Sequence, residues 1–383
     1  DYLYYWSMRI TSQELLHFRN HVKTSVSWAP HLNVITGPNG AGKTSLIDAI
    51  HFLCMSRSFV STTDQYVINS DEKYFMIKGH FEGKIRSEFD VSCSYSRGEG
   101  KKVFVNDSPL DRLSDLIGMV PVVVLAPDDK KLTLEGPIER RSFLDSFISQ
   151  ISKSYLRDLI DYRKVRRQRN TLLKDFQGSV SVLKSYLEPW NIQLIETGSR
   201  IIATRFEVLE NFKAYLERDY AMISGMDLTT GMEYQTFCEP STNPEDIRVQ
   251  YEKALEETID KEIEREQTLT GPHKDEVVFY LDEFELRRFG SQGQHRLFAL
   301  SLKLAQLHYY SDELEDLPIL MLDDVFGDLD LKKTEILLEA LQNHEGQTFI
   351  TSANPVPFEE YVDFDGTRNK FFSVHDGIIK EKA

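Results

Sequence analysis

The sequence has few cysteines, a deficit of positive charge and no long apolar run. Its three cysteines lie far apart and in no metal-binding spacing, which excludes a disulfide framework and a cysteine zinc site. The longest apolar run, Met119 to Ala126, is far shorter than the roughly 20 residues that cross a bilayer. We therefore expect a reduced, soluble, cytoplasmic protein with no membrane partner. Met8, the first methionine, is a candidate natural start, with Asp1 to Ser7 as an extension.

The deficit of positive charge is large. Forty-five lysine and arginine residues against 61 acidic residues give a net charge of −16. This balance argues against a protein whose whole surface coats nucleic acid or anionic membrane. It leaves a local basic face open, because the segment from Arg140 to Lys174 contains ten basic and three acidic residues. Residues 239–266, with four basic and ten acidic residues, have the opposite character.

The chain of 383 residues is long enough for two lobes, and its pattern of apolar and polar residues changes twice. Short β-rich runs alternate with turns up to Asp128 and return, between helices, after Leu269. The stretch between them is charged and helical in period, with residues of one face recurring every three or four positions. These residues are Tyr155, Leu159, Tyr162, Val165, Arg169 and Leu172. We therefore predict an α/β lobe, residues 1–130 and 269–383, interrupted by a helical second lobe, residues 131–268.

A phosphate-binding loop is the clearest motif in the chain. Residues 37–44 match the pattern G-x-x-x-x-G-K-[ST] in full. An apolar strand precedes the loop and an apolar-periodic helix follows it, which is the context that this motif requires. The glycines permit a tight turn whose backbone N–H groups converge on phosphate oxygens at a helix N-terminus. The predicted nucleotide-binding residues are Gly37, Pro38, Asn39, Gly40, Ala41, Gly42, Lys43, Thr44 and Ser45.

The second half of the site follows the apolar run Ile319 to Leu322, which is typical of a buried parallel strand. Ligands bind beyond the carboxyl ends of such strands. Asp323 is therefore expected to bind Mg²⁺ together with Thr44, while Lys43 reaches the β- and γ-phosphates of ATP. Asp324 is a candidate catalytic base or water-positioning group. The alternative is that the two aspartates are solvated turn residues.

A third motif opens a helix shortly before the aspartate pair. Ser291 and Gln294 have the spacing of a capping box, which is a complete structural explanation. A glycine-flanked serine at a helix N-terminus is also an anion site. The position matches the signature of ABC-type ATPases, in which one subunit closes over the γ-phosphate bound by another, and the turn after the aspartate pair resembles their D-loop. The residues expected to act on the partner's nucleotide are Ser291, Gln292, Gly293, Gln294 and Asp328.

The order and the residues of these motifs resemble those of the RecF family of bacterial recombination mediators, which are related to the heads of SMC proteins. The resemblance covers nearly the whole chain from Met8 and extends beyond the ATPase motifs. Its further carriers include Phe18-Arg19-Asn20, Ser56-Arg57-Ser58-Phe59, Ala126-Pro127-Asp128-Asp129, Arg140-Arg141-Ser142-Phe143-Leu144-Asp145 and Gly271-Pro272-His273-Lys274-Asp275. It implies an α/β, ABC/SMC-type P-loop ATPase head with a helical insertion lobe. It also makes Arg19 a candidate contact to the nucleotide, the alternative being a surface arginine after a strand.

The resemblance implies an ATP-dependent DNA-binding protein of recombinational repair and replication maintenance. Its expected cofactors are ATP and Mg²⁺, and its expected activity is a weak, DNA-stimulated ATPase. ATP binding is expected to drive a homodimer on double-stranded DNA near gaps, and slow hydrolysis to release it. The implied partners are gapped DNA and a RecR-type mediator that acts with RecO to help load RecA at the nucleoid. The alternatives are another SMC or overcoming-lysogenisation-like ATPase head, or a non-hydrolysing, ATP-switched scaffold.

The basic segment supplies the candidate DNA face, with Arg163, Lys164, Arg166 and Arg167 as its expected contacts. The alternative is a solvated helix that carries an excess of basic residues. If the face is real, the acidic total does not exclude DNA. It indicates binding that is local and weak in each monomer, and strengthened when ATP pairs two basic faces.

Overall fold

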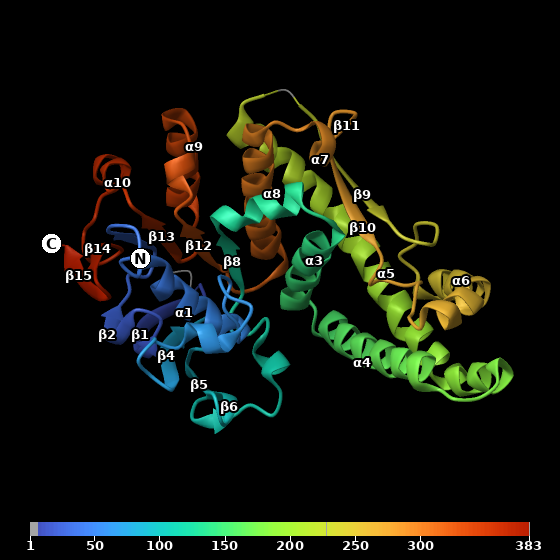
Figure 1. The fold of residues 1–383 in the computed structure, drawn as a ribbon. Coiled ribbons are helices and arrows are strands. Elements are labelled where there is room, and N and C mark those ends of the chain that lie inside the picture. The colour runs from blue at the N-terminus through green and yellow to red at the C-terminus, as the bar shows by residue number, and fades with distance from the viewer. Residues whose placement is uncertain (1–6, 227, 383) are drawn as a thin grey trace. The chain divides into compact units, whose positions relative to one another are not determined.

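The computed structural model describes residues 7–226 and 228–382 (Figure 1). Residues 1–6, nearly all of the extension before Met8, lie outside this description. The chain divides into an α/β unit, residues 1–129, 222–225 and 300–383, and a helical unit, residues 130–221 and 226–299. Among the described residues, no helix combines the length and the apolar character that a membrane crossing requires.

Within its described residues, the α/β unit contains two six-stranded sheets. The antiparallel sheet has the order β2-β1-β4-β5-β6-β7. Its strands are β1 Arg9–Phe18, β2 His21–Ser27, β4 Tyr74–Glu82, β5 Glu88–Ser96, β6 Gly100–Val105 and β7 Ser108–Pro109. The second sheet has the order β15-β14-β3-β13-β12-β8 and is parallel except for β15. Its strands are β3 Leu32–Thr36, β8 Val122–Leu125, β12 Ile319–Asp323, β13 Thr348–Ser352, β14 Asn369–His375 and β15 Ile378–Lys382.

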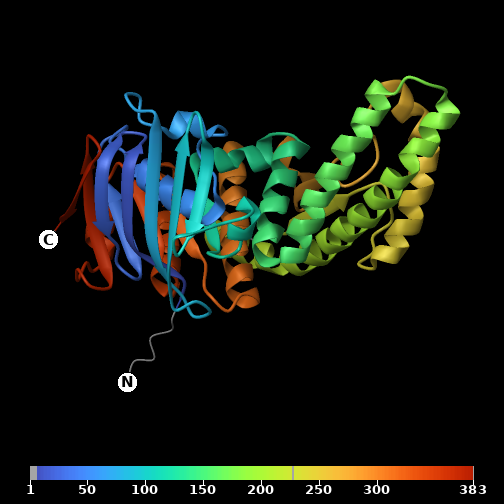
Figure 2. The same cartoon turned by 90° about the horizontal axis from the view of Figure 1, so that it is seen from below.

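The helices of the α/β unit are few and mostly short. They are α1 Lys43–Met55, α9 Leu331–Asn343, α10 Val356–Tyr361 and the 3₁₀ turns η1 Asp64–Val67, η2 Leu113–Leu116, η3 Pro127–Lys130 and η4 Phe326–Asp328. All residues of α1 except Thr44 are buried, because the helix contacts strands of both sheets (Figure 2). Burial of this helix on all sides fixes the phosphate-binding loop that precedes it.

The strands β3, β12 and β13 are buried at every position. A strand that is covered on both faces requires a continuous apolar run rather than an alternating pattern. The strands predicted from the runs before the phosphate-binding loop and before the aspartate pair are therefore confirmed.

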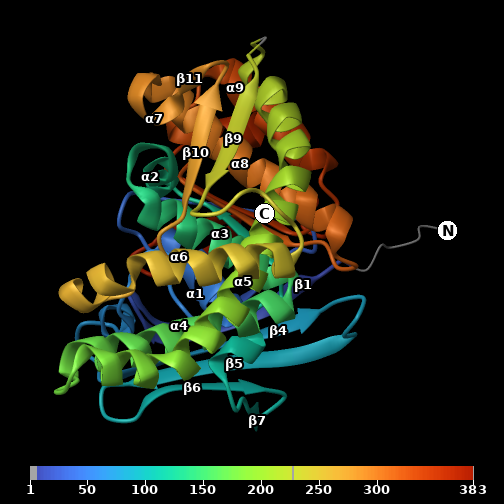
Figure 3. The same cartoon turned by 90° about the vertical axis from the view of Figure 1, so that its right-hand side faces the viewer.

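The helical unit contains most of the long helices together with a small antiparallel sheet of order β11-β10-β9 (Figure 3). Its elements are α2 Lys131–Leu134, α3 Pro137–Ile151, α4 Lys153–Asp175, α5 Val180–Ser224, α6 Pro244–Arg265, α7 Leu286–Phe289, β9 Thr230–Gln235, β10 Glu276–Leu281 and β11 Phe284–Glu285. The helix α8 Gln292–Glu313 begins in the helical unit and ends in the α/β unit, and the last residues of α5 also belong to the α/β unit.

The division into units differs from the predicted lobes mainly at residues 269–299, and residues 222–225 also group with the α/β unit. The predicted boundary after residue 130 lies one residue beyond the observed one, but residues 269–299 group with the helical unit rather than with the ATPase lobe. The physical reason is the set of long-range contacts that β10 makes. The strand β10 pairs with β9 along its length, and Glu276 at its start forms a double hydrogen bond with Arg140 of α3, at 2.7 and 2.9 Å.

Candidate nucleotide-binding site and basic face

The phosphate-binding loop connects β3 to α1 and depends on its glycines. Gly37, Gly40 and Gly42 have φ angles of 152°, 80° and 110°, which lie in the region that favours glycine. A Cβ atom at Gly42 would lie 2.7 Å from Nε2 of His21, and one at Gly37 would overlap the backbone carbonyl of Val374. The loop therefore needs glycine both for its backbone conformation and for its packing.

Lys43 points into this loop. Its Nζ donates hydrogen bonds to the carbonyl oxygens of Gly37, at 2.8 Å, and Pro38, at 3.0 Å. Burial lowers the pKa of Lys43, whereas the nearby charges of Asp324 and Asp323 oppose this shift. The ammonium group thus lies between the loop and the aspartate pair, where it can meet a bound phosphate.

A hydroxyl and a carboxylate from distant segments converge beside the loop. Oδ1 of Asp323 accepts hydrogen bonds from the hydroxyls of Thr44, at 2.8 Å, and Thr351, at 2.6 Å. Burial raises the pKa of Asp323, and the hydrogen bonds from both threonines counteract the shift. Hydroxyl and carboxylate oxygens are ligands that Mg²⁺ accepts, usually alongside substrate phosphates. Thr44 and Asp323 therefore fit the predicted role in binding Mg²⁺, and the loop fits the phosphates.

Asp324 has an uncommon backbone conformation. Its φ of 49° is positive, which is uncommon outside glycine although aspartate adopts it more readily than most residues. Its N–H donates to the carbonyl oxygen and to the hydroxyl of Thr351, both at 3.1 Å. Thr351 thus positions both aspartates, a role that the sequence did not predict and that only the β12–β13 pairing reveals.

Arg19 is engaged by a buried carboxylate. Its Nε and Nη2 donate to Oδ2 of Asp48 at 3.0 and 2.7 Å, and Nη2 also donates to Ser58 at 3.1 Å. Asp48 is fully buried on α1. Burial raises the pKa of Asp48, and the charge of Arg19 opposes that shift. The arginine therefore anchors the segment after β1 to α1, and its contact with the nucleotide stays a prediction.

Two residues beside Arg19 support the loop directly. The amide of Asn20 donates to the carbonyl of Gly40, at 3.1 Å, and accepts from Ser45, at 2.9 Å. The His21 Nε2 lies 3.0 Å from the carbonyl oxygen of Gly42. Sequence reasoning missed these contacts, although the Phe-Arg-Asn segment was the signal that could have identified them.

The capping box at the start of α8 is confirmed. The N–H of Ser291 donates to the Gln294 side chain at 2.8 Å, and the N–H of Gln294 donates to the Ser291 hydroxyl at 3.3 Å. Ser291, Gln292 and Gly293 are exposed. This segment belongs to the helical unit, whereas Lys43 belongs to the α/β unit. Its action on a partner's nucleotide stays a prediction, and the side chain of Asp328 lies outside the described residues.

The structure divides the basic segment into buried and surface residues. Arg169 is completely buried and binds Glu262, also completely buried, at 2.6 Å, and Arg140 is engaged by Glu276. These two arginines are therefore structural and do not contribute to a DNA face. The four predicted DNA contacts all lie on α4. They are Arg163, Lys164 and Arg167, which are exposed, and Arg166, which is half-buried.

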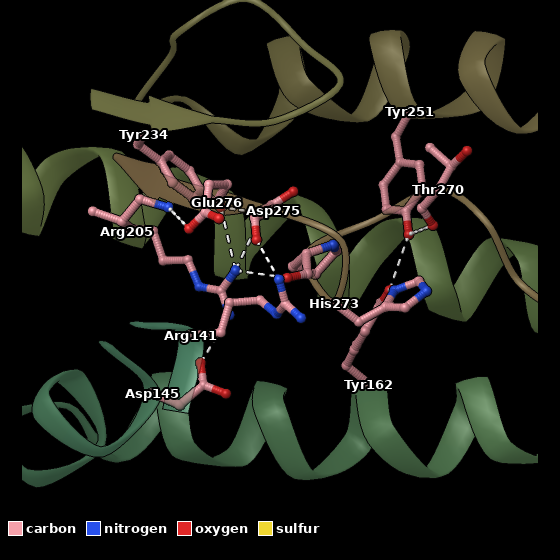
Figure 4. Close-up of polar contacts among 12 residues, drawn as sticks. Arg141, Asp145, Tyr162, Arg205, Tyr234, Tyr251, Thr270, His273, Asp275 and Glu276 are labelled. Carbon is pink, nitrogen blue, oxygen red and sulfur yellow. Dashed lines mark hydrogen bonds and ion pairs between the residues drawn. The ribbon is translucent and has the colours of Figure 1, made fainter. Parts of the chain in front are cut away.

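A buried arginine joins two segments that the sequence had singled out without a mechanism (Figure 4). Arg205 on α5 is 2% exposed and donates to Asp145 at 2.8 Å, Asp275 at 3.1 Å and the carbonyl of Pro272 at 2.8 Å. Tyr234 also donates to Asp275. The segments containing Asp145 and Asp275 thus meet around one cation, which sequence spacing alone did not predict.

Comparison with known proteins agrees with this geometry. The family model for the RecF/RecN/SMC N-terminal domain matches residues 9–375. The chain is 39% identical over 375 residues to the DNA replication and repair protein RecF of Salinibacter ruber, covering 97% of this chain and 91% of that protein. It is 36% identical over 378 residues to RecF of Halalkalibacterium halodurans, covering 98% of this chain and 100% of that protein.

Solved structures give the same result. A structure described as the recombination mediator protein RecF with ATP in the RecFOR pathway has a TM-score of 0.91 and 29% identity, and it covers 100% of both chains. The Smc head domain of Pyrococcus furiosus has a TM-score of 0.57 and 16% identity over 98% of this chain and 96% of that one, which shows the fold alone. The predicted α/β ATPase-head fold is therefore confirmed, and the chain belongs to the RecF family.

Proposed function

We propose that this chain is an ATP-dependent DNA-binding protein of recombinational repair and replication maintenance. The observation that carries the proposal is the convergence of Lys43, Thr44 and Asp323 at the phosphate-binding loop. The relatives support the biological setting, since they are named DNA replication and repair proteins and one solved RecF structure contains ATP.

The residues of the site have separate tasks. Backbone N–H groups of residues 37–44 and the ammonium of Lys43 bind the phosphates. Thr44 and Asp323 would hold Mg²⁺, which would supply positive charge to neutralise the phosphates of ATP. Asp324 positions the attacking water and accepts its proton. Its side chain is one methylene shorter than the glutamate usual in ABC transporters, so we expect slow hydrolysis that acts as a timer rather than as a motor.

The site is completed by a second copy of the chain. Ser291 and the backbone of Gln292 and Gly293 bind the γ-phosphate held by the partner, and the Asp328 turn crosses the interface. Only ATP provides this γ-phosphate, so ATP shifts the equilibrium toward the dimer by binding the dimeric state more tightly. The dimer presents two basic faces to double-stranded DNA, and a RecR-type mediator with RecO joins it near gaps.

The proposal is tested by binding to gapped and intact duplex DNA across a salt series, with ATP and with ADP. We expect binding that is tighter with ATP and that falls steeply with salt, because phosphate contacts release counterions. DNA binding that is indifferent to the nucleotide would contradict the proposal. ATP turnover measured in the same samples separates a hydrolysing clamp from a non-hydrolysing scaffold.

A further inference from the structure

A small pocket in the helical unit is lined by more cations than anions. Its volume is about 260 Å³, and α3, α4, α5 and the Pro272–His273 turn form its walls. Four arginines and one carboxylate line it. The arginines are Arg141, Arg163, Arg166 and Arg205, and the carboxylate is Asp145.

Both carboxylate oxygens of Asp145 already accept hydrogen bonds. Its Oδ1 accepts hydrogen bonds from the buried Arg205 and from the hydroxyl of Tyr155, both at 2.8 Å. Its Oδ2 accepts from Arg163 at 2.8 Å, an ion pair whose arginine is 57% exposed. Because the arginine of this pair lies largely in solvent, the pair contributes little stability and Arg163 can turn to another anion. The single carboxylate of the pocket therefore does not neutralise the remaining arginines.

Among the residues that the structure describes, two of these arginines lack a carboxylate partner. Nη1 of Arg141 donates to the backbone carbonyl of Asp275, at 2.6 Å. Within residues 7–226 and 228–382, Arg166 makes no hydrogen bond or ion pair through its side chain. Burial and the neighbouring Arg205 lower the pKa of Arg141, although Glu276, Asp275 and Asp145 oppose this shift. The pocket thus keeps unbalanced positive charge in a partly desolvated place.

His273 responds to the same positive potential. Its Nε2 donates to the carbonyl of Thr268 at 3.1 Å, so Nδ1 accepts the hydroxyl proton of Tyr162, at 2.7 Å. Burial, together with the charges of Arg166, Lys274 and Arg141, lowers the pKa of His273 to about 3. The imidazole is therefore neutral and forms a rigid wall of the pocket rather than a further cation.

The volume of the pocket indicates the size of the ligand that it can hold. It is smaller than the roughly 300–1,000 Å³ that drug-sized ligands occupy, which suits a single tetrahedral anion better than a whole nucleotide. Arginine forks bind phosphate oxygens in pairs. A phosphate group that approaches from solvent can meet Arg166 and Arg141 and displace Arg163 from Asp145.

A stripe of cations beside the pocket indicates a polymer of phosphates. Arg157, Lys164, Arg167 and Lys174 lie within one face of α4 roughly 100° wide, since they are spaced by seven, three and seven residues. All four are exposed, and none has a carboxylate within ion-pairing distance among the described residues. Duplex DNA presents one charge per roughly 1.7 Å of its axis and can meet the whole stripe, whereas one acidic side chain cannot.

We propose that this pocket seats one backbone phosphate of duplex DNA, held by Arg141 and Arg166, while the α4 stripe contacts neighbouring phosphates. The inference rests on the proposed DNA-binding function and adds to it a defined anchor point. It gives the Gly271–Asp275 and Arg140–Asp145 segments a shared task. Arg205 is a positioning residue in this account, because it holds the two segments together and does not itself have to contact DNA.

The test uses the full chain with ATP and a fluorescent gapped duplex, with affinity measured by anisotropy across a salt series. Arg166→Gln is expected to weaken binding roughly tenfold, as for the loss of a charged hydrogen bond. It should also lower the slope of log affinity against log salt by about one. Arg166→Lys should restore most of the slope because it restores the charge. Arg97→Gln, an exposed arginine between β5 and β6, is the matched control and should leave both quantities unchanged.

A second measurement locates the anchored phosphate. Duplexes in which one phosphate at a time is replaced by a neutral methylphosphonate should weaken wild-type binding most at one position, and the Arg166→Gln variant should show no loss there. Arg141→Gln should behave like Arg166→Gln. If it fails to fold, Arg166→Gln, which removes no hydrogen bond or ion pair among the described residues, still decides the question.

The proposed function and the phosphate pocket can be refuted separately. If the wild-type chain shows no ATP-dependent DNA binding, the proposed function is wrong. If the wild type binds DNA with a steep salt slope while the Arg166→Gln slope equals it, the pocket is not a phosphate seat and the function stands. A loss of affinity for a polyglutamate peptide in Arg166→Gln, with DNA binding intact, would likewise overturn the inference in favour of a protein-docking pocket.

Discussion

The phosphate-binding loop differs in its charges from the arginine pocket, the small pocket lined by Arg141, Arg163, Arg166 and Arg205. At the loop, a single ammonium, Lys43, bonds neutral carbonyls and faces two aspartates. In the pocket, several guanidinium groups surround one carboxylate that is already used. The first balance suits a phosphate that arrives together with a divalent cation, for which Asp323 is the proposed ligand. The second suits a phosphate that arrives without one.

The two regions also differ in how they are built. The loop is one contiguous segment of eight residues completed by Asp323, whereas Arg205 and Asp275 are 70 residues apart and Arg141 and Asp275 are 134 apart. Contiguous motifs tolerate changes elsewhere in the chain. A network assembled from distant segments is expected to be more sensitive, because each member supports the others.

The largest expected effect comes from removing the centre of the network. Arg205→Met leaves Asp145 and Asp275 without their shared cation, and breaking a buried pair costs about 3–5 kcal/mol. The free energy of unfolding, measured in urea, should fall by this amount. The matched control is Arg163→Met, which removes the exposed partner of the same Asp145 and should cost below about 1 kcal/mol. Equal losses in both variants would contradict the assigned roles.

The next effect is at the loop. Lys43→Met removes the ammonium that meets the phosphates and should weaken ATP binding on the order of 100-fold, by analogy with the loss of a buried charged contact. Titration with a fluorescent ATP analogue measures it. Lys23→Met, an exposed lysine on β2, is the control. The thermal midpoint of the Lys43→Met variant should change little, which distinguishes loss of the site from loss of the fold.

A smaller effect concerns the metal. Asp323→Asn should weaken the affinity for Mg²⁺ in the presence of ATP by at least roughly 10- to 100-fold, the range found when a group that supports a metal site is lost. Because burial raises the pKa of Asp323, the wild type should lose Mg²⁺-dependent binding as the pH falls, and at a higher pH than an ordinary aspartate would. A pH profile that is identical in wild type and variant would show that another group binds the metal.

The smallest expected effect concerns the protonation state of His273 and its contribution to stability. The pKa of His273 is about 3 in the folded chain and about 6.5 when unfolded, so the unfolded state takes up the proton first. The free energy of unfolding should therefore fall as the pH drops below about 6.5 toward 3. In His273→Gln, the loss between pH 7 and pH 5 should be smaller by about 2 kcal/mol. An unchanged pH dependence would contradict the neutral state of His273.

The predictability of each region follows from its construction. The buried strands, the glycine loop and the capping box at Ser291 were predicted because each is specified by neighbours in the sequence. The buried face of α4 was also predicted, but its spacing did not show that Arg169 on that face pairs with Glu262. Local periodicity identifies which face is buried, but it does not identify the partner.

The interactions that sequence reasoning missed are long-range. Thr351 reaches Asp323 and Asp324 only because β13 pairs with β12, and Arg205 reaches Asp145 and Asp275 only because α5 lies beside both segments (Figure 4). The grouping of residues 269–299 with the helical unit has the same origin, since β10 finds β9 as its partner. Contacts between distant segments have no characteristic spacing along the chain, so a single sequence does not predict them.

The most direct test of the account is the mass of the protein in solution, measured by light scattering at micromolar concentration. We expect a monomer without nucleotide or with ADP and a dimer with ATP. Ser291→Arg should bind ATP and stay monomeric, and Lys43→Met should stay monomeric because it does not bind ATP. Ser291→Ala loses the same capping hydroxyl without the added bulk, so the thermal midpoints of the two variants should agree if Ser291→Arg disturbs the helix no further. An unchanged mass with ATP, or normal dimers of both Ser291→Arg and Lys43→Met, would contradict the split site.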